Sequence, residues 1–396
     1  MGKLRQIHWK LLSLILLAAS TCLYLHRLLA DEAGTAGSGS ARCEWERWSC
    51  ELQNSSCADL SWSDCASCNG SWLGLALPKT WLRKSPPLSN CFVTGDDEMR
   101  CLPTLLNLAP PKSGTTEIYQ QIQTMPEVIS AAPAEPSSLC RGRSAFWCSK
   151  EPSFWHAPRS AASLQEYTLM YQPLTEKLQG GSGSSTIAVD WSPLNYEANP
   201  YLLGRFVGPA ARFVAFLRNP VQRAESDYNW SIYTVGLSCT ASKKKIQSPG
   251  SSSGSSQAMH KLFASSVKDF TTCAATSSPL RCWRRGAPAR ELNCRTFRES
   301  SAYVLRGLYS VYLSSFLEVF PGQLLVARAE SLTWPRLAAL LGATLAPRPT
   351  TATLAPFRGK HQVHLLPETQ QLLKSFYAPY VLELQHMFND STLSWW

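Results

Sequence analysis

The chain of 396 residues is predicted to be an α/β protein, with a central parallel sheet flanked by helices, an N-terminal transmembrane helix and a cysteine-rich stem. Three observations predict this architecture. At positions 105–122, an apolar run leads through a glycine-containing loop into an amphipathic helix. At 212–230, a near-continuous apolar run typical of buried parallel strands again precedes a helix. A third apolar run, Leu11–Leu25, follows basic residues and precedes a dense group of cysteines.

The N-terminal apolar run is predicted to be a transmembrane signal anchor covering residues 11–30. Three basic residues lie in the short tail before it, residues 1–10, and positive charge on this side keeps the tail in the cytosol. A cleaved signal peptide is the alternative, but no small-x-small cleavage site lies between the apolar core and the basic pair that follows it. The sequence therefore predicts a type II membrane protein whose remaining residues lie in the lumen.

Residues 31–96 are predicted to be a flexible, cysteine-rich lumenal stem. Of the fourteen cysteines, only Cys22 lies in the apolar run, which leaves thirteen beyond it, a density typical of an oxidising compartment. The cysteines in the compact part of the stem are Cys43, Cys50, Cys57, Cys65 and Cys68. The last two form a CxxC that is also compatible with half a zinc site or a redox pair. No second CxxC or histidine accompanies it, so a disulfide-stapled module is the better interpretation.

Further bridges are expected beyond the stem. Cys91 and Cys101 are expected to tie the stem to the α/β domain, predicted at residues 97–396. A polar insertion at Lys243–Gln257 is expected to form an exposed loop. The cysteines that bracket it, expected to form two bridges, are Cys239, Cys273, Cys282 and Cys294. Because thirteen is an odd number, at least one cysteine is expected to stay free or to pair between chains.

The formal net charge of +10 comes without a basic block long enough to suggest a nucleic-acid arm. In a secretory protein, this balance favours a polyanionic glycan or an anionic cofactor as partner; a merely basic surface is the alternative. Tripeptides that can accept N-linked glycans also suit the secretory pathway. They begin at Asn54, Asn69, Asn229 and Asn389.

The stretch 105–122 is predicted to bind a phosphate-like group. Its loop places Lys112 and Gly114 before a helix N-terminus, where free N–H groups and the helix dipole favour an anion. The order differs from G-x-x-x-x-G-K-[ST], because the lysine precedes the only glycine. Taken alone, an ordinary strand-to-helix turn explains this loop equally well. The candidate ligands are Lys112, Ser113, Gly114, Thr115 and Thr116.

A second anion site is predicted where the strand Phe213–Leu217 ends. Arg218 follows this strand, at the edge where ligands bind in open α/β sheets. Asn219-Pro220 then begins a helix that carries Ser226 about two turns after Arg218. An arginine and a serine hydroxyl suit a terminal phosphate. A helix cap with ordinary surface arginines is the alternative.

A charged pair, Lys150 and Glu151, lies between aromatic runs, although aromatic side chains are usually buried and charges are not. The alternative is a surface loop with an exposed ion pair. Further along, Thr186–Val189 is predicted to be a short strand that ends at Asp190.

These segments together resemble the Golgi carbohydrate sulfotransferases. The Pro111–Thr116 sequence PKSGTT is similar to the 5′-phosphosulfate loop of enzymes that use 3′-phosphoadenosine 5′-phosphosulfate, abbreviated PAPS. The Leu217–Tyr228 segment resembles the 3′-phosphate site of this family, which follows the loop by about a hundred residues. Lys150-Glu151-Pro152-x-Phe154-Trp155 resembles a K-E-P-H-aromatic-aromatic segment whose glutamate is the base. This chain has Ser153 where the family usually has histidine.

Two later blocks are similar to one branch, which contains N-acetylgalactosamine 4-sulfate 6-O-sulfotransferase and the heparan sulfate sulfotransferases. These blocks span 307–326 and 366–380. Arg358-Gly359-Lys360 is similar, with a changed order, to a basic glycine loop that closes over the cofactor in that branch.

The resemblance implies a P-loop-like sulfotransferase fold in a single-pass type II Golgi membrane enzyme. It implies transfer of a sulfuryl group from PAPS, without a metal, to a hydroxyl of a glycosaminoglycan-like or sulfated glycan. Glu151 would be the base, and Lys112 would stabilise the leaving phosphate oxygen. The donor-binding residues would be Lys112, Ser113, Gly114, Thr115, Thr116, Arg218, Ser226, Arg358 and Lys360. Lys150 and Asp190 are the candidate contacts to the acceptor, and Asp190 is also the second candidate base.

Three other functions stay open on sequence alone. A phosphotransferase using the same loop is disfavoured by the missing GK[ST] and by the lack of an evident magnesium ligand set. A catalytically silent lumenal glycan-binding protein is disfavoured by the joint presence of the lysine, glutamate, arginine and serine. A protein-tyrosine sulfotransferase is less similar. The acceptor sugar, the position modified, and oxygen versus nitrogen as the target also stay open.

Overall fold

The computed structural model describes residues 91–93, 98–123, 125, 127–132, 145–152, 154–155, 161–179, 186–207, 211–240, 256–286, 302–332 and 363–396. All of these belong to the second of two compact units, Asn69–Trp396. The predicted tail, signal anchor and most of the stem lie outside the described residues, as do Ser153, Arg358 and Lys360. Among the described helices, none has the length and apolar character needed to cross a membrane.

The centre of the unit is a parallel sheet with strand order β4-β5-β3-β6-β7. The strands are β3 (Leu105–Asn107), β4 (Val128–Ser130), β5 (Ile187–Asp190), β6 (Arg212–Leu217) and β7 (Leu324–Arg328). Leu106 of β3 pairs with Asp190 on one side and with Phe213 on the other. All of β6 except Arg212 is buried, which explains its continuous apolar sequence. The prediction of a central parallel sheet is confirmed.

The order of the strands creates a switch point between β3 and β6. From β3 the chain runs outward to β4 and returns to β5, whereas from β6 it runs to β7 on the opposite side. Ligands of open α/β sheets bind outside the carboxyl ends of such strands, where the following connections diverge. The two predicted anion-binding loops follow β3 and β6, and they therefore meet at this point.

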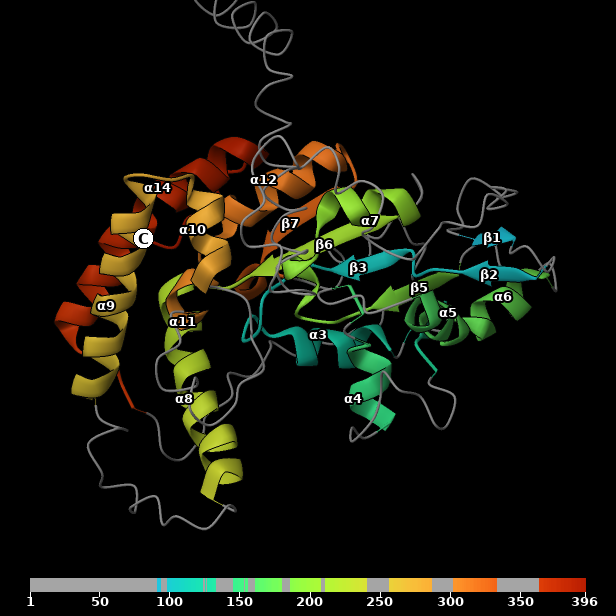
Figure 1. Cartoon of the computed structure of the whole chain (residues 1–396), viewed down its shortest axis with the longest axis horizontal. Helices are drawn as coiled ribbons and strands as arrows, with labels where there is room; N and C mark the ends of the chain where they lie inside the picture. The colour runs from blue at the N-terminus through green and yellow to red at the C-terminus, as the bar shows by residue number, and fades with distance from the viewer. Residues whose placement is uncertain are drawn as a thin grey trace, which may run out of the picture. The chain divides into compact units, whose positions relative to one another are not determined.

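Helices lie on both sides of the sheet, and Figure 1 shows α3 and α4 on one side with α7 and α12 on the other. The helices of the first half are α3 (Thr115–Ile122), α4 (Ala145–Lys150), α5 (Ala161–Leu169), α6 (Gln172–Gln179) and α7 (Pro200–Phe206). Those of the second half are α8 (Pro220–Thr240), α9 (Ser256–Ala274), α10 (Pro279–Gly286), α11 (Ala302–Leu305), α12 (Tyr309–Val319) and α14 (Pro367–Phe388). Two short 3₁₀ turns are η4 (Asn195–Glu197) and η7 (Ala329–Ser331).

The helix after the first loop, α3, is fixed to the sheet by its apolar face. Ile118, Tyr119 and Ile122 are fully buried and join a core cluster with strand residues such as Val189 and Val214. Their spacing matches one face of a helix, and the prediction of an amphipathic helix after the loop is confirmed. Full burial of each large apolar side chain stabilises the fold by about 1.5–3 kcal/mol. The start of α3, where the anion is expected, therefore stands on a rigid element.

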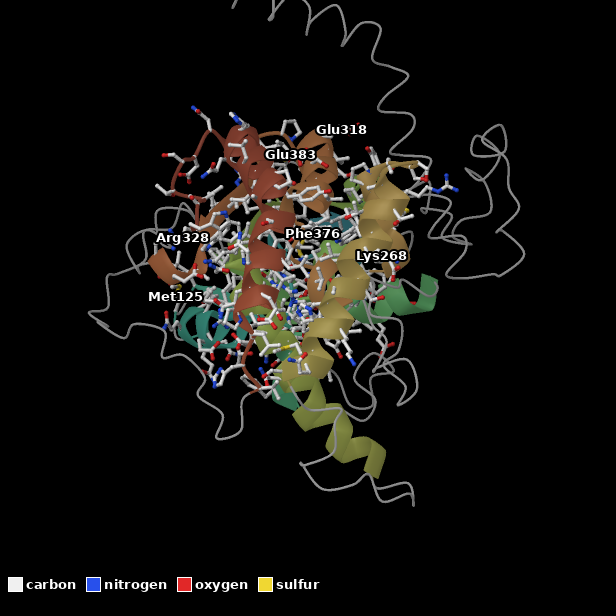
Figure 2. The ribbon with its side chains drawn as sticks, turned by 90° about the vertical axis from the view of Figure 1, so that its left-hand side faces the viewer. Met125, Lys268, Glu318, Arg328, Phe376 and Glu383 are labelled. Atoms are coloured by element: carbon white, nitrogen blue, oxygen red, sulfur yellow. A yellow bond between two sulfur atoms is a disulfide. The ribbon has the colours of Figure 1, made fainter. Side chains whose placement is uncertain are left out.

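Helices α9 and α14 pack side by side, as Figure 2 shows with Lys268 labelled on α9 and Phe376 on α14. Phe376 contacts Phe270 of α9 with 5.7 Å between ring centroids. Tyr377 of α14 donates its hydroxyl to the Val304 carbonyl at 2.7 Å. A Cβ at Gly307 would lie 2.9 Å from the Tyr377 ring, so only glycine fits there. The sequence predicted an exposed loop through Gln257, but Ser256 and Gln257 begin α9, because a helical face of buried residues starts at Met259.

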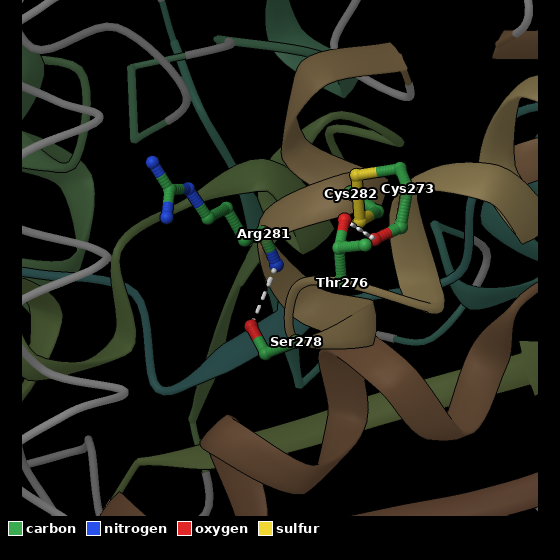
Figure 3. Close-up of a disulfide and its surroundings, with 5 residues drawn as sticks. All are labelled: Cys273, Thr276, Ser278, Arg281 and Cys282. Atoms are coloured by element: carbon green, nitrogen blue, oxygen red, sulfur yellow. Dashed lines mark hydrogen bonds between the residues drawn. A yellow bond between two sulfur atoms is a disulfide. The ribbon is translucent and has the colours of Figure 1, made fainter.

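Two disulfides are described. Cys91–Cys101 joins the antiparallel strands β1 (Cys91–Val93) and β2 (Met99–Cys101), so the bridge links the end of the predicted stem range to the start of the α/β domain. Cys273–Cys282 joins α9 to α10 (Figure 3). In the turn between these helices, Ser278 Oγ accepts the Arg281 N–H at 3.2 Å. The other two cysteines around the insertion, Cys239 and Cys294, have side chains outside the described part of the chain.

Candidate active site

The loop after β3 holds an unusual backbone that opens toward solvent. Lys112 and Gly114 have φ angles of 71° and 82°, the left-handed region that favours glycine. The first hydrogen bond of α3 runs from Ile118 N–H to Gly114 O at 3.2 Å, so the N–H groups of residues 115–117 precede the helix ladder. A Cβ placed on Gly114 would meet nothing within 4 Å. The loop therefore presents N–H groups beside an open space.

Side-chain hydrogen bonds hold this loop at both ends. Asn107, the last residue of β3, accepts the Ala109 N–H at 3.0 Å and donates to the Ser192 carbonyl at 3.4 Å. At the other end, Trp191 Nε1 donates to the Thr115 carbonyl at 2.7 Å. These bonds fasten the loop to the chain that follows β5.

The loop after β6 contacts the loop after β3. Arg218 Nη1 donates to the Lys112 carbonyl at 3.5 Å, and the Arg218 carbonyl accepts the Tyr309 hydroxyl at 2.7 Å. Asn219 Oδ1 accepts the N–H groups of Val221 and Gln222 at 2.9 and 3.3 Å, which makes Asn219 the N-cap of α8. The prediction that Asn219-Pro220 begins a helix is confirmed. Asn219 caps this helix, and the neighbouring Arg218 contacts the first loop.

Arg223, one turn into α8, belongs to a buried charge cluster. It is 0% exposed and donates to Asp227 Oδ2 at 3.0 Å, while Arg306 donates to the same oxygen at 3.2 Å. Arg306 also lies 4.0 Å from Glu197. The alternative that the arginines of this segment are ordinary surface residues is therefore wrong for Arg223. Arg223 also contacts the first loop, because its Nη1 donates to the Pro111 carbonyl at 3.5 Å.

Positive charge converges on the mouth of the first loop. The Lys112 ammonium lies 5.1 Å from the centroid of the Trp230 ring. Burial lowers the pKa of Lys112; Asp227 and Glu117 oppose this shift, and the cations Arg218 and Lys150 add to it.

Ser226 is half-buried on α8, four residues before Trp230 and hence on the same side of that helix. An anion at this mouth would meet several positive groups.

The Lys150–Glu151 pair lies at the end of α4, beside β5. Lys150 is 1% exposed and forms an ion pair with Glu151, whose side chain is 18% exposed. The Lys150 carbonyl accepts the Trp191 N–H at 3.1 Å, which places the pair at the carboxyl end of β5. The surface-loop alternative is therefore wrong for Lys150. Glu151 keeps partial access to solvent, as a base for an incoming hydroxyl requires.

Asp190 is fully buried at the end of β5. Its Oδ2 accepts the Tyr167 hydroxyl at 2.6 Å and its Oδ1 accepts the Ser192 N–H at 2.9 Å. Burial raises the pKa of Asp190, and these hydrogen bonds oppose the rise. The Tyr167 hydroxyl also accepts the Trp155 Nε1–H at 2.9 Å. The arrangement ties the segment that follows Glu151 to β5.

The residues present fit a donor that carries a phosphosulfate. Ser113 is buried, and its Oγ has no hydrogen-bond partner among the described residues. A buried hydroxyl without a partner is costly, and an oxygen of a bound ligand would supply the missing hydrogen bond. The N–H groups of residues 115–117, the open space beside Gly114 and the Lys112 ammonium complete an anion cradle. Within the described part of the chain, no group of three His, Cys, Asp or Glu side chains is arranged to hold a metal ion.

Comparison with known proteins finds similarity to curated proteins that share one name. No protein-family model matches the chain. Carbohydrate sulfotransferase 15 from Mus musculus is 23% identical over 341 residues, which cover 75% of this chain and 55% of that protein. The Homo sapiens and Rattus norvegicus proteins of the same name match over 349 and 341 residues, also at 23% identity, with the same coverage. The chain is similar, at low identity, to curated proteins named carbohydrate sulfotransferase.

The chain spans about half the length of these carbohydrate sulfotransferase relatives, 55% in each case. Among solved structures, it is similar to a sulfotransferase from Alicyclobacillus acidocaldarius, with 16% identity and a TM-score of 0.41 over 73% of this chain and 96% of that chain. A structural similarity with so low a TM-score carries no argument about the fold or the function of this chain. The α/β fold is instead established by the chain's own parallel sheet.

The structure brings most of the predicted site residues together. Lys112, Arg218, Lys150 and Glu151 lie around the carboxyl ends of β3, β5 and β6, whereas Arg358 and Lys360 lie outside the described residues. Sequence reasoning missed Asn107 and Trp230. A polar residue that ends a buried strand was a usable signal for Asn107. For Trp230, the signal was its position one helical turn after Ser226.

Proposed function

We propose that the protein transfers a sulfuryl group from PAPS to a hydroxyl of a glycan. The observation that carries this proposal is the contact between the two anion-binding loops: Arg218 of the second loop donates to the backbone of Lys112 in the first. A ligand with two anionic ends fits such a pair of sites better than a single phosphate does. The curated relatives named carbohydrate sulfotransferase support sulfuryl transfer as the reaction.

When bound, PAPS supplies an activated sulfuryl group whose other bond is to a phosphate oxygen. Its 5′-phosphosulfate would be held by the Lys112 ammonium, the Ser113 hydroxyl and the N–H groups at the start of α3. Its 3′-phosphate would be held by Arg218 and Ser226. The basic pair at Arg358 and Lys360 is proposed to add charge to the same ligand. The complete set of donor-binding residues proposed here is Lys112, Ser113, Gly114, Thr115, Thr116, Arg218, Ser226, Arg358 and Lys360.

Two side chains would supply the chemistry. Glu151 would accept the proton of the attacking hydroxyl, a role worth about 10²–10⁴ in rate. Lys112 would stabilise the negative charge that grows on the leaving phosphate oxygen. Lys150, paired with Glu151, would hold the carboxylate in place and neighbour the acceptor. Asp190 is already held by Tyr167 and Ser192, so we assign it a positioning role and keep Glu151 as the base.

The acceptor is proposed to be a polyanionic glycan, such as a glycosaminoglycan or another sulfated polysaccharide. The net charge of +10 supports an anionic partner. We further propose a Golgi membrane enzyme of type II topology, with residues 11–30 as the anchor and a cysteine-rich stem before the catalytic domain. Protease treatment of intact microsomes tests this topology: the catalytic domain should be protected, and digestion from the cytosolic side would contradict it.

Donor selectivity separates this proposal from the alternatives. A ligand that binds only the native state raises the melting temperature by mass action. Adenosine 3′,5′-bisphosphate, the nucleotide part of PAPS without its sulfate, should therefore protect the purified lumenal domain against heat, whereas ATP should protect it weakly. Equal or better protection by ATP would favour a phosphotransferase. Protection by sulfated glycans alone would favour a silent glycan-binding protein.

A further inference from the structure

Trp230 lies on α8 beside the proposed donor site, and it is not among the residues proposed to bind the donor or to take part in the reaction. Its side chain is 42% exposed, which makes it one of the few large apolar side chains left open among the described residues. Its ring centroid lies 5.1 Å from Lys112 Nζ. Trp230 is four residues after Ser226 on the same helix, so it stands on the face of α8 that carries the proposed 3′-phosphate contact.

Burial is the largest influence on the charge of Lys112 and disfavours the ammonium form, so an attractive group close to the side chain would stabilise it. Burial lowers its pKa, and the nearby cations Arg218 and Lys150 act in the same direction. Asp227 and Glu117 oppose this effect through longer-range attraction, but no carboxylate of the described residues forms an ion pair with Lys112 within 4.0 Å. The face of an indole ring is the strongest of the aromatic partners for an ammonium group.

We propose that Trp230 is a positioning residue for Lys112. The negative face of the indole holds the Lys112 ammonium at the mouth of the loop, so that the positive charge is already in place when the anionic donor binds. A free lysine side chain loses rotamer freedom when it is fixed on a ligand; a lysine already held by Trp230 loses less on binding. This inference rests on the proposed function for its effect on donor binding, but the contact itself is independent of the donor.

The first test measures the contact without any donor. Acetic anhydride labels free lysine amines, and the ring should shield Lys112 and favour its unreactive ammonium form. In Trp230→Leu, Lys112 should be acetylated about two- to fivefold faster, the ratio that corresponds to an exposed cation–π contact. Trp230→Phe should restore most of the protection, and labelling of the exposed Lys268 should be equal in all variants. Equal labelling of Lys112 in wild type and Trp230→Leu would overturn the proposal.

The second test is a double-mutant cycle on the affinity for adenosine 3′,5′-bisphosphate, measured by calorimetry. Trp230→Leu should weaken binding about two- to fivefold in the wild-type background and should have no effect in a Lys112→Ala background. An equal loss in both backgrounds would show that Trp230 acts directly on the nucleotide, which would overturn the proposal. Leu382→Ala, at an exposed site on α14, is the control.

The two tests also separate this inference from the proposed function. If wild type binds no bisphosphate, the proposed function fails, and the labelling result alone decides whether Trp230 holds Lys112. If wild type binds and Lys112→Ala weakens binding, the donor site stands, and the cycle decides the role of Trp230. Matching melting temperatures of Trp230→Leu and wild type would show that the fold is retained. If the Leu variant does not fold, both measurements are made on Trp230→Phe, in which Lys112 should be labelled somewhat faster, and the bisphosphate bound somewhat more weakly, than in wild type. Values equal to those of wild type would then overturn the proposal.

Discussion

Arg218 donates a hydrogen bond to the carbonyl oxygen of Lys112, with 3.5 Å between Nη1 and that oxygen. The two residues are 106 positions apart in the chain and follow neighbouring strands of a parallel sheet. Strands that run side by side in the same direction end at the same edge, so the loops that follow them meet there. The contact places the two proposed anion sites within reach of one ligand.

Arg218→Ala is expected to weaken binding of adenosine 3′,5′-bisphosphate about 10- to 100-fold, because it removes a charge-assisted hydrogen bond to the 3′-phosphate. Adenosine 5′-phosphate, which lacks that group, should bind wild type and the variant alike. Calorimetry with both nucleotides measures the difference. Lys268→Ala, which removes a positive charge from the exposed face of α9, is the matched control and should bind like wild type. A loss of equal size for both nucleotides would contradict the assignment of Arg218 to the 3′-phosphate.

Glu151→Gln is expected to lower kcat by about 10²–10⁴, the usual contribution of a general base, with little change in donor affinity. Glutamine keeps the shape and the hydrogen-bonding capacity of the side chain but does not accept a proton at neutral pH. Steady-state sulfate transfer and bisphosphate binding are the two measurements. Glu176→Gln, on the exposed side of α6, controls for loss of a negative charge. Normal turnover of Glu151→Gln would move the search for the base to Asp190.

Lys112→Ala is expected to lower both kcat and donor affinity, because its charge acts on the donor in the ground state and in the transition state. The contrast with Glu151→Gln is the test: one variant should lose turnover alone, and the other should lose both. If Lys112→Ala bound the bisphosphate as wild type does, the first loop would not be the 5′-phosphate site.

Arg223→Met is expected to lower the free energy of unfolding by about 3–5 kcal/mol, since it leaves the buried Asp227 with part of its charge unpaired. Arg306 still contacts Asp227 at 3.2 Å, which limits the loss. Denaturant unfolding measures the change, and Lys268→Met provides the comparison for an exposed cation. A cost below about 1 kcal/mol, typical of surface ion pairs, would contradict the burial of this cluster.

Of the two described glycosylation sequons, Asn389 is expected to carry a glycan and Asn229 is not. Asn229 is buried, and its amide donates to the Val363 carbonyl at 2.9 Å and accepts the Val363 N–H at 2.8 Å. Asn389 is exposed at the end of α14, with a left-handed φ of 47°. Mass spectrometry of glycopeptides from protein secreted by animal cells tests this. Occupancy at Asn229 in folded protein would contradict the pairing with Val363.

The sheet and the two loops were predictable because local sequence determines them. The strand β6 is buried on both faces and reads as an uninterrupted apolar run, and Asn219-Pro220 marks the start of the next helix. The spacing of Ile118, Tyr119 and Ile122 likewise identifies the buried face of α3. The strands β1, β2 and β4 have three residues each, too few to show a period. The equally short β3 was found only because an apolar run leads there into the glycine-containing loop.

The surroundings of the site depend on contacts between residues far apart in the chain. Arg223 is buried because Arg306, 83 positions later, shares Asp227 with it, and no local pattern indicates such a partner. The same holds for Asp190, which the sequence offered as a second base: its hydrogen bond to Tyr167 follows from the packing of α5 against the sheet. The contact between Lys112 and Trp230 joins two segments whose closeness only the sheet order determines.

The measurement that tests the proposed function most directly is transfer of labelled sulfate. The secreted lumenal domain is incubated with PAPS carrying labelled sulfate and a panel of desulfated and partly sulfated glycosaminoglycans, and the products are mapped by disaccharide analysis. We expect label on one class of glycan at one position, with Glu151→Gln and Lys112→Ala reduced as described and Glu176→Gln unchanged. Absence of label on every glycan, from wild-type protein that binds adenosine 3′,5′-bisphosphate, would contradict carbohydrate sulfuryl transfer.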